Sequence, residues 1–185
     1  MSAVVLDGRR ARGDRTKRAL LEATLDVVAR DGVGAVTHRS VTRRAGVPAT
    51  SAAYHYPSIR DLLEAALLWA DQQNREALVA IAEAAEPISA LARWLVEDYG
   101  QDRSRCLAEY ELYLHAARVS ALRPAAMQWV ADLATFLGRW TTSELAIRLT
   151  CAYVDGMLIE AHVSGSWPSA ADVEVSLRML LAVDA

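Results

Sequence analysis

The sequence is poor in residues that interrupt helices, with 9 Gly and 5 Pro among 185 residues. No stretch alternates apolar and polar residues in the way that a half-buried strand does. Apolar residues make up 53% of the chain, and the prominent ones, alanine and leucine, favour helices. These features predict an all-α fold, and the helical patterns along the chain number about nine.

Cysteine is also scarce. Cys106 and Cys151 each lie in an apolar helical pattern without a CxxC-type neighbour, which fits buried thiols in a reducing cytoplasm better than a disulfide. No Gly-rich phosphate loop, metal-ligand spacing or paired nucleophile and base occurs in the sequence. We therefore expect no cofactor, no metal and no enzymatic activity.

Long apolar runs are missing as well. Residues 1–8 lack the apolar core of a signal peptide, and no later apolar run approaches the roughly 18 residues that span a bilayer. The expectation is a cytoplasmic protein without a membrane partner.

Acidic residues are few in the first part of the chain and basic residues are few in the rest. Residues 1–60 carry 11 Arg and Lys against 5 Asp and Glu, whereas residues 61–185 carry 9 against 18. This split predicts a polyanion-binding head on a body that stays off the polyanion. Residues 1–13, with Arg9, Arg10 and Arg12, are expected to form a flexible basic arm that contacts phosphates, the alternative being a tail that only aids solubility.

The stretch from Thr37 to Leu62 has the pattern of two short helices joined by a tight turn. Thr37 is a candidate helix cap, Gly46 suits the turn, and Pro48 suits the first position of the next helix, where its missing N–H has no partner. A helix over residues 14–31, capped by Asp14, precedes them. Residues 14–60 are therefore predicted to form a helix-turn-helix head.

The third predicted helix, over residues 48–54, carries small side chains on its exposed side. Thr50 and Ser51 lie there, and Tyr54 and His55 follow. Small side chains let a helix approach base edges in a major groove, where hydroxyls bond bases or phosphates. Since no Arg or Asn lies here, specificity is expected to depend on hydroxyls and DNA shape. The structural alternatives are a Tyr54 that caps the core and a His55 that is merely an exposed neutral imidazole.

Taken together, these residues resemble the DNA-binding domain of the tetracycline-repressor (TetR) family of bacterial transcription regulators. The resemblance covers residues 15–65 and rests on Ala45-Gly46-Val47-Pro48, Tyr54-His55-Tyr56-Pro57-Ser58 and Asp61-Leu62-Leu63. It implies a homodimeric repressor that a small-molecule effector releases from a palindromic double-stranded DNA operator.

The resemblance also implies which residues contact DNA. They are Thr37, Arg39, Thr50, Ser51, Tyr54 and His55, to which Lys17 and Arg44 are added. The chain departs from the family's pattern at Thr50, Tyr56 and Ile59, where the family frequently has glycine, phenylalanine and a basic residue. Arg60, one place after Ile59, is expected to take over the phosphate contact of that basic residue.

A long helix predicted over residues 58–85 begins in the head and ends in the body, residues 61–185, so changes in the body can tilt the DNA-contacting helices. Aromatic side chains on later helices are candidates to line a ligand cavity, although this spacing is also typical of a core. They are Trp94, Tyr110, Tyr113, Trp129 and Phe136. His115 is either a polar group in that cavity or a surface residue paired with Glu111.

The last two predicted helices carry apolar stripes. The first, opened by a capping box from Thr141 to Glu144, has the stripe Leu145, Leu149, Ala152, Gly156, Ile159 and Val163; the second, capped by Ser169, has Val173, Leu177, Leu180 and Leu181. Small residues allow close helix approach, so the two helices are expected to form a four-helix bundle with a second copy. The alternative is that they only close the monomer's own core.

Two other functions remain open. One is a family member without a ligand, regulated by its expression or by a protein partner. The other is a small helical ligand carrier or enzyme whose basic head is incidental.

Overall fold

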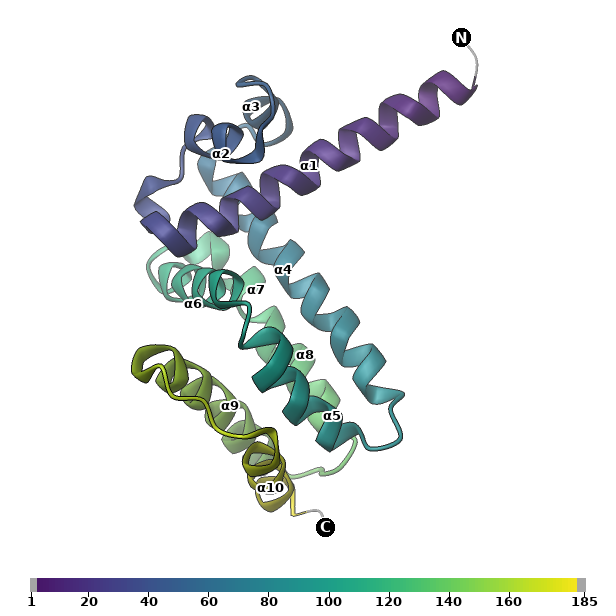
Figure 1. The fold of residues 1–185 in the computed structure, drawn as a ribbon, viewed down its shortest axis with the longest axis vertical. Coiled ribbons are helices and arrows are strands. Elements are labelled where there is room, and N and C mark those ends of the chain that lie inside the picture. The colour runs from purple at the N-terminus through teal and green to yellow at the C-terminus, as the bar shows by residue number, and fades with distance from the viewer. Residues whose placement is uncertain (1–2, 183–185) are drawn as a thin grey trace. The chain divides into compact units, whose positions relative to one another are not determined.

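The computed structural model describes residues 3–182. All regular elements in this range are helical and none is a strand, which confirms the predicted all-α class (Figure 1). The α-helices are α1 (Ala3–Asp31), α2 (His38–Ala45), α3 (Ser51–His55), α4 (Ile59–Ala82), α5 (Pro87–Arg93), α6 (Arg103–Arg118), α7 (Arg123–Ala126), α8 (Gln128–Leu137), α9 (Glu144–Ser164) and α10 (Ala170–Leu181). Two 3₁₀ turns, η1 (Val33–Ala35) and η3 (Ser120–Leu122), and one π-helical turn, η2 (Trp94–Tyr99), complete them.

The chain divides into two compact units. The first comprises the residues up to Ala70 together with Leu107–Ala126, and the second comprises Asp71–Cys106 and the residues from Met127 on. Helices α4 and α6 therefore contribute residues to both units. The predicted head, residues 14–60, did not include the α6 segment that belongs to the first unit.

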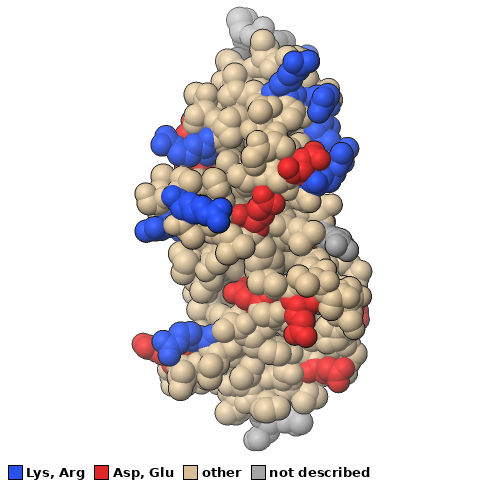
Figure 2. All heavy atoms as spheres, turned by 90° about the vertical axis from the view of Figure 1, so that its left-hand side faces the viewer, with Lys and Arg blue, Asp and Glu red and all other residues tan. Residues whose placement is uncertain are grey.

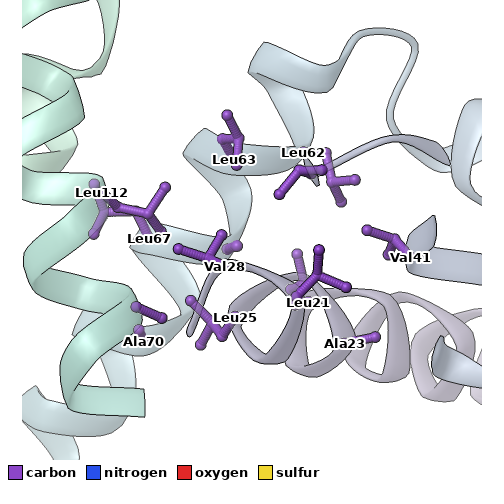
Figure 3. Close-up of a cluster of buried hydrophobic side chains, with 14 of the residues drawn as sticks. Leu21, Ala23, Leu25, Val28, Val41, Leu62, Leu63, Leu67, Ala70 and Leu112 are labelled. Atoms are coloured by element: carbon purple, nitrogen blue, oxygen red, sulfur yellow. The ribbon is translucent and has the colours of Figure 1, made fainter. Parts of the chain in front are cut away.

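One apolar cluster holds the first unit together. Its buried side chains come from α1, α2, α4 and α6 and include Leu25, Val28, Val41, Leu67 and Leu112. Figure 3 shows Leu112 of α6 next to Leu67 of α4. Burying an aliphatic side chain of this size contributes about 1.5–3 kcal/mol, so α4 and α6 both stabilise the helices of the helix-turn-helix.

Helix α1 begins at Ala3, so the predicted helix start at Asp14 is wrong and residues 3–13 are helical instead of an irregular arm. The physical reason is that this segment has no proline, and its two glycines, Gly8 and Gly13, each cost a helix only about 1 kcal/mol relative to alanine. Residues 1–2 of the predicted arm lie outside the described residues.

The second unit is built from α5, η2, α8, α9, α10 and the last turns of α4. Helix α10 packs against α5 and α9, and α8 packs against α9. The chain between α9 and α10 is held by Trp167, whose ring lies edge-on to His162 at 5.0 Å between centroids. A Cβ atom on Gly100 would come within 2.3 Å of the Trp167 ring, so only glycine fits beside this tryptophan.

Several helix ends differ from the predictions. Helix α9 is capped by Ser143, whose hydroxyl accepts a hydrogen bond from Ala146 N–H at 3.3 Å, so the predicted capping box at Thr141 is wrong. Two hydroxyl residues lie within three positions here, and either matches a capping pattern. The cap of α10 by Ser169 is confirmed by its 3.1 Å hydrogen bond from Asp172 N–H. The apolar pattern after Pro124 predicts one helix, whereas the structure has two, α7 and α8.

No helix within residues 3–182 is both long and apolar enough to cross a lipid bilayer.

Candidate nucleic-acid interface

The turn between α2 and α3 has the conformation that the sequence indicated. Thr37 caps α2 through its hydroxyl, which accepts from Ser40 N–H at 3.0 Å, and Ser40 Oγ accepts from Thr37 N–H at 2.9 Å. Gly46 follows α2 with φ 65° and ψ 27°, a left-handed conformation that glycine adopts without steric cost. Val47 N–H then donates to Thr42 C=O at 3.1 Å, and the chain turns into α3.

Helix α3 is shorter than predicted. It begins at Ser51 rather than at Pro48, because the residues before it form a turn in which Ser51 N–H donates to Pro48 C=O at 2.9 Å. This bond spans three residues, the tighter 3₁₀ spacing that is common at helix ends. Ala52 is fully buried and anchors α3 to the core.

The outer surface of α3 carries Thr50, Ser51, Tyr54 and His55, which the resemblance implied as DNA contacts. Thr50 is exposed, Ser51 and His55 are half-buried, and Tyr54 is 82% exposed. Tyr54 therefore does not cap the core. The neighbouring Tyr56 packs against the core instead, and burial raises the pKa of its hydroxyl. The result is a short helix whose outer surface has two hydroxyls, a phenol and an imidazole.

The structure brings Lys17 of α1 near His55 of α3. Burial lowers the pKa of His55, and the positive charge of Lys17 lowers it further. The His55 ring contacts the Tyr54 ring edge-on, with 5.0 Å between centroids. A pKa below the ordinary value of 6.5 keeps this imidazole neutral at pH 7, so it can both donate and accept a hydrogen bond at the interface.

The predicted cationic contacts fall into two groups. Within the part of the chain that the structure describes, Lys17 and Arg39 form no ion pair, although both are exposed. Arg44 pairs with Asp26 of α1, and Arg60 lies 3.7 Å from Asp61 at the start of α4. Exposed ion pairs of this kind are worth about 0–1 kcal/mol, so a phosphate competes readily with the carboxylate of Asp61 for Arg60.

Charge is unevenly distributed over the surface. On the face shown in Figure 2, Lys and Arg side chains gather over the first unit, whereas Asp and Glu predominate over the second unit. This distribution agrees with the charge split in the sequence. A positive potential around the first unit attracts phosphates over a distance of about 8–10 Å at physiological salt.

The predicted ligand-binding residues belong to both units. Trp94, Trp129 and Phe136 lie in the second unit, while Tyr110 and Tyr113 lie on the α6 segment of the first. Trp94 and Trp129 are 6.1 Å apart between ring centroids. Phe136 is buried and contacts Trp140 rather than this pair.

Tyr99 joins Trp94 and Trp129 in an aromatic cluster, although it was not among the predicted ligand-binding residues. Its ring stacks on Trp94 at 5.1 Å and on Trp129 at 6.1 Å. The π-helical turn η2 explains this contact, because Gly100 N–H donates to Leu95 C=O five residues earlier. In an α-helix, side chains five residues apart point about 140° away from each other, so regular helical spacing did not indicate the pair.

Polar contacts of α4 accompany this aromatic cluster in the second unit. Arg105 lies over the Tyr99 ring at 5.6 Å and donates to the Asn74 side chain of α4. Arg75, next along α4, pairs with Asp132 of α8 at 2.8 Å and with Asp71 at 3.5 Å. The apolar spacing along residues 58–85 predicts Asp71 on the polar side of that helix, but Asp71 is only 4% exposed, so this prediction is wrong. It is buried because it shares the inward face of α4 with Asn74 and Leu78, which are buried as well.

The stripe predicted on α9 is exposed. Leu145, Leu149, Ile159 and Val163 are 46–84% exposed, and Ala152 and Gly156 between them are exposed as well. The groove along this face has a volume of about 610 Å³, and Met157 and Pro168 are among its lining residues. The stripe predicted on α10 differs, because Val173, Leu177 and Leu181 are buried within the unit. The exposed apolar residues of α10 are Val175 and Met179.

No other chemistry is apparent in the described residues. They contain no group of three or more His, Cys, Asp or Glu side chains that could hold a metal ion. Both cysteines are buried. Burial raises the pKa of Cys151 to about 11, and Asp155 adds to this shift, so the thiol stays protonated and unreactive.

Two family models match the chain. The model described as "Bacterial regulatory proteins, tetR family" matches residues 20–66, and "Tetracyclin repressor-like, C-terminal domain" matches residues 82–183. No curated protein matches the chain.

Solved structures resemble it over nearly their whole length. A member of the TetR family from Streptomyces coelicolor A3 has 30% identity and a TM-score of 0.77, covering 92% of this chain and 99% of the other. The multidrug binding protein EbrR complexed with imidazole has 31% identity and a TM-score of 0.72, covering 91% and 96%. The same protein complexed with ethidium has 29% identity and a TM-score of 0.74, covering 92% and 99%.

The pKa of His55 provides a test of the contact between α1 and α3. An NMR titration of the His55 ring is expected to give a pKa below 6.5. Lys17→Met should raise this pKa while leaving it below 6.5, because burial remains, and Lys17→Arg should leave it unchanged. Since the unfolded chain binds the proton more readily than the folded chain, the free energy of unfolding should fall as the pH decreases through 6.5. An unchanged pKa in Lys17→Met would show that the two side chains are not neighbours.

Proposed function

Since this chain belongs to the TetR family of DNA-binding transcription regulators, we propose that it is a repressor that binds a palindromic operator as a homodimer and leaves the operator when a small molecule binds. The observation that carries the proposal is the outer surface of α3, where Thr50, Ser51 and Tyr54 are accessible. Lys17 and Arg39 lie on the adjoining helices α1 and α2.

DNA recognition follows from the size and chemistry of these side chains. The short hydroxyl side chains let α3 lie deep in the major groove, where Thr50 and Ser51 bond base edges. Lys17 and Arg39 bind phosphates, which supply affinity but no sequence information. Two copies of α3 then read successive major grooves about 34–36 Å apart, and this spacing requires a palindromic site.

The homodimer interface that we propose is the exposed stripe of α9. Six positions on one face of this helix are apolar or glycine and are accessible in the monomer. Ala152 and Gly156, at the middle of the stripe, leave room for a partner helix to approach closely. Contact with the same stripe of a second copy satisfies the two-fold symmetry that a palindromic operator demands.

The ligand that we propose is an aromatic cation. The EbrR complexes hold ethidium, proflavin and malachite green as well as imidazole, and the first three are aromatic cations. Trp94 and Trp129 are half-buried, and their aromatic rings are of the kind that attracts such molecules. Release requires that the ligand binds more tightly to the DNA-free conformation than to the DNA-bound one.

Operator binding should depend on the surface of α3. In the variant Thr50→Ala with Tyr54→Ala, affinity for a DNA fragment selected from the genome should fall by at least tenfold, since each lost base contact costs about 1–3 kcal/mol. Fluorescence anisotropy at a fixed salt concentration measures this, with circular dichroism as the check on folding. Thr142→Ala, at an exposed site between α8 and α9, is the control. Undiminished binding by the double variant, or equal affinity of the native protein for random DNA, would contradict sequence-specific recognition.

The dimer should depend on the stripe of α9. Leu149→Asp combined with Val163→Asp is expected to give monomers in analytical ultracentrifugation, because association would bury unpaired carboxylates. Val79→Asp, at a 57% exposed position on α4, is the matched control and should remain dimeric. A dimeric double variant would exclude α9 as the interface.

Ligand binding should depend on the aromatic cluster. Ethidium is expected to bind the native protein and to lower its affinity for the operator. Trp94→Ala should weaken ethidium binding by about 2- to 30-fold, the range that one cation–π contact of about 0.5–2 kcal/mol supplies. Isothermal titration calorimetry measures both affinities, and Trp69→Phe, in the first unit, is the control. If none of the three dyes releases the protein from its operator, the result would instead favour regulation by a protein partner or by expression.

A further inference from the structure

The carboxylate of Glu111 extends from α6 to the backbone between α1 and α2. Its Oε1 accepts a hydrogen bond from Val33 N–H at 2.5 Å. Val33 is the first residue of η1, and the first N–H groups of a helical turn have no partner within the turn. A pair between Glu111 and His115 was one of the two alternatives for His115, but no ion pair joins these two residues in the described part of the chain. The carboxylate instead holds a segment 78 residues away in the sequence.

Gly32 gives the backbone the conformation that this contact requires. Its φ of 85° and ψ of 161° lie in a region that is essentially restricted to glycine. Gly32 N–H still donates to Val28 C=O at 2.9 Å, as the last bond of α1. A Cβ atom on Gly32 would lie 3.4 Å from Glu111 Oε1. The turn after α1 therefore passes directly beside the carboxylate.

Hydrogen bonds continue from this turn to the start of α2. Val36 N–H donates to Val33 C=O at 3.1 Å, which closes η1. Ser40 Oγ donates to Ala35 C=O at 2.9 Å and accepts from Thr37 N–H. Hydrogen bonds thus connect the Glu111 carboxylate, η1 and the cap of α2. These bonds end at Thr37, two residues before Arg39.

Helix α6 is firmly fixed to the first unit by its apolar face. Ala108, Leu112 and Ala116, four residues apart, are each no more than 2% exposed, and they belong to the same cluster as the core residues of α1 and α2. The helix nevertheless begins at Arg103, among residues of the second unit. A displacement of α6 therefore moves Glu111 together with the core of the first unit.

We propose that Glu111 is a positioning residue for operator binding. Through Val33 it holds the start of α2 where Thr37 and Arg39 contact DNA, and it makes α6, besides α4, a route by which changes in the second unit reach these contacts. This role rests on the proposed function. It adds a residue that touches neither DNA nor ligand.

Two conservative variants distinguish the effect of the length of the Glu111 side chain from the effect of its charge. Glu111→Asp keeps the negative charge but shortens the side chain by one methylene, so the bond to Val33 N–H is lost. Glu111→Gln loses the charge but keeps an acceptor oxygen at the same reach. Operator affinity should fall by about tenfold in Glu111→Asp, within the range of typical couplings between sites, and by no more than about twofold in Glu111→Gln. Hydrogen exchange of the Val33 amide in the DNA-free protein should accelerate in Glu111→Asp only.

The controls distinguish positioning from other effects. Glu64→Gln removes the same charge from α4, where the Glu64 carboxylate makes no hydrogen bond or ion pair among the described residues, and it should resemble Glu111→Gln. In an Arg39→Ala background, Glu111→Asp should cost clearly less affinity than in the native protein, because both changes affect the same contact. An equal cost in both backgrounds would overturn the proposal.

Other outcomes are equally decisive. If Glu111→Asp binds the operator like the native protein, the positioning role is excluded while the proposed function stands. If Glu111→Gln binds more tightly than the native protein and Glu111→Asp does not differ from it, Glu111 acts only through its charge. Failure of the native protein to bind any selected operator would overturn both the proposed function and this role.

Discussion

The outer surface of α3, which we propose contacts DNA, depends on the burial of the inner side of this helix. Helix α3 has five residues, and an isolated helix of fewer than about 12 residues is marginal in water. It persists because Ala52 is fully buried and Tyr56, just after it, packs against the core formed by α1, α2, α4 and α6. Since the inner side supplies the stability, the outer side is free to consist of small polar residues. A mutation in this core therefore affects DNA binding without touching DNA.

The cationic side chains of the first unit also divide into two groups. Some form ion pairs within the protein, and others have no carboxylate partner among the described residues. Arg18 and Arg44 pair with Glu22 and Asp26 along α1, and these pairs lower the net field of the helices. Arg39, by contrast, has no carboxylate partner within the described residues and follows the cap of α2. Arg39 is thus available to bind a phosphate, on the helix that precedes α3. A binding surface of this kind depends on salt, because each phosphate contact releases a counterion.

Local chemistry explains why much of the head was predictable. Thr37 and Gly46 are recognisable because a cap and a left-handed turn each require particular residue types. The element against which a helix packs is not encoded by a local residue pattern of this kind. Helical periodicity identifies an apolar face but not its partner, which is why the stripe of α10 was assigned to a second copy although it is buried in the monomer. Periodicity likewise placed Asp71 in solvent, and neither the π-helical turn behind Tyr99 nor the contact of Glu111 with Val33 has a sequence pattern.

Chain connectivity limits how the two units can influence each other. The chain passes between them within α4, within α6, and between α7 and α8. Where the chain crosses between the units inside a helix, the connection is stiff, because bending the helix breaks backbone hydrogen bonds. Where it crosses between two helices, a few backbone dihedral angles can absorb a displacement. If a ligand shifts residues of the second unit, as we propose, it acts on the first through α4 and α6. Helix α4 leads directly from α3, and α6 reaches the start of α2 through Glu111. The two helices thus act on opposite ends of the helix-turn-helix, so a difference in their displacement changes the geometry of the DNA-contacting surface itself.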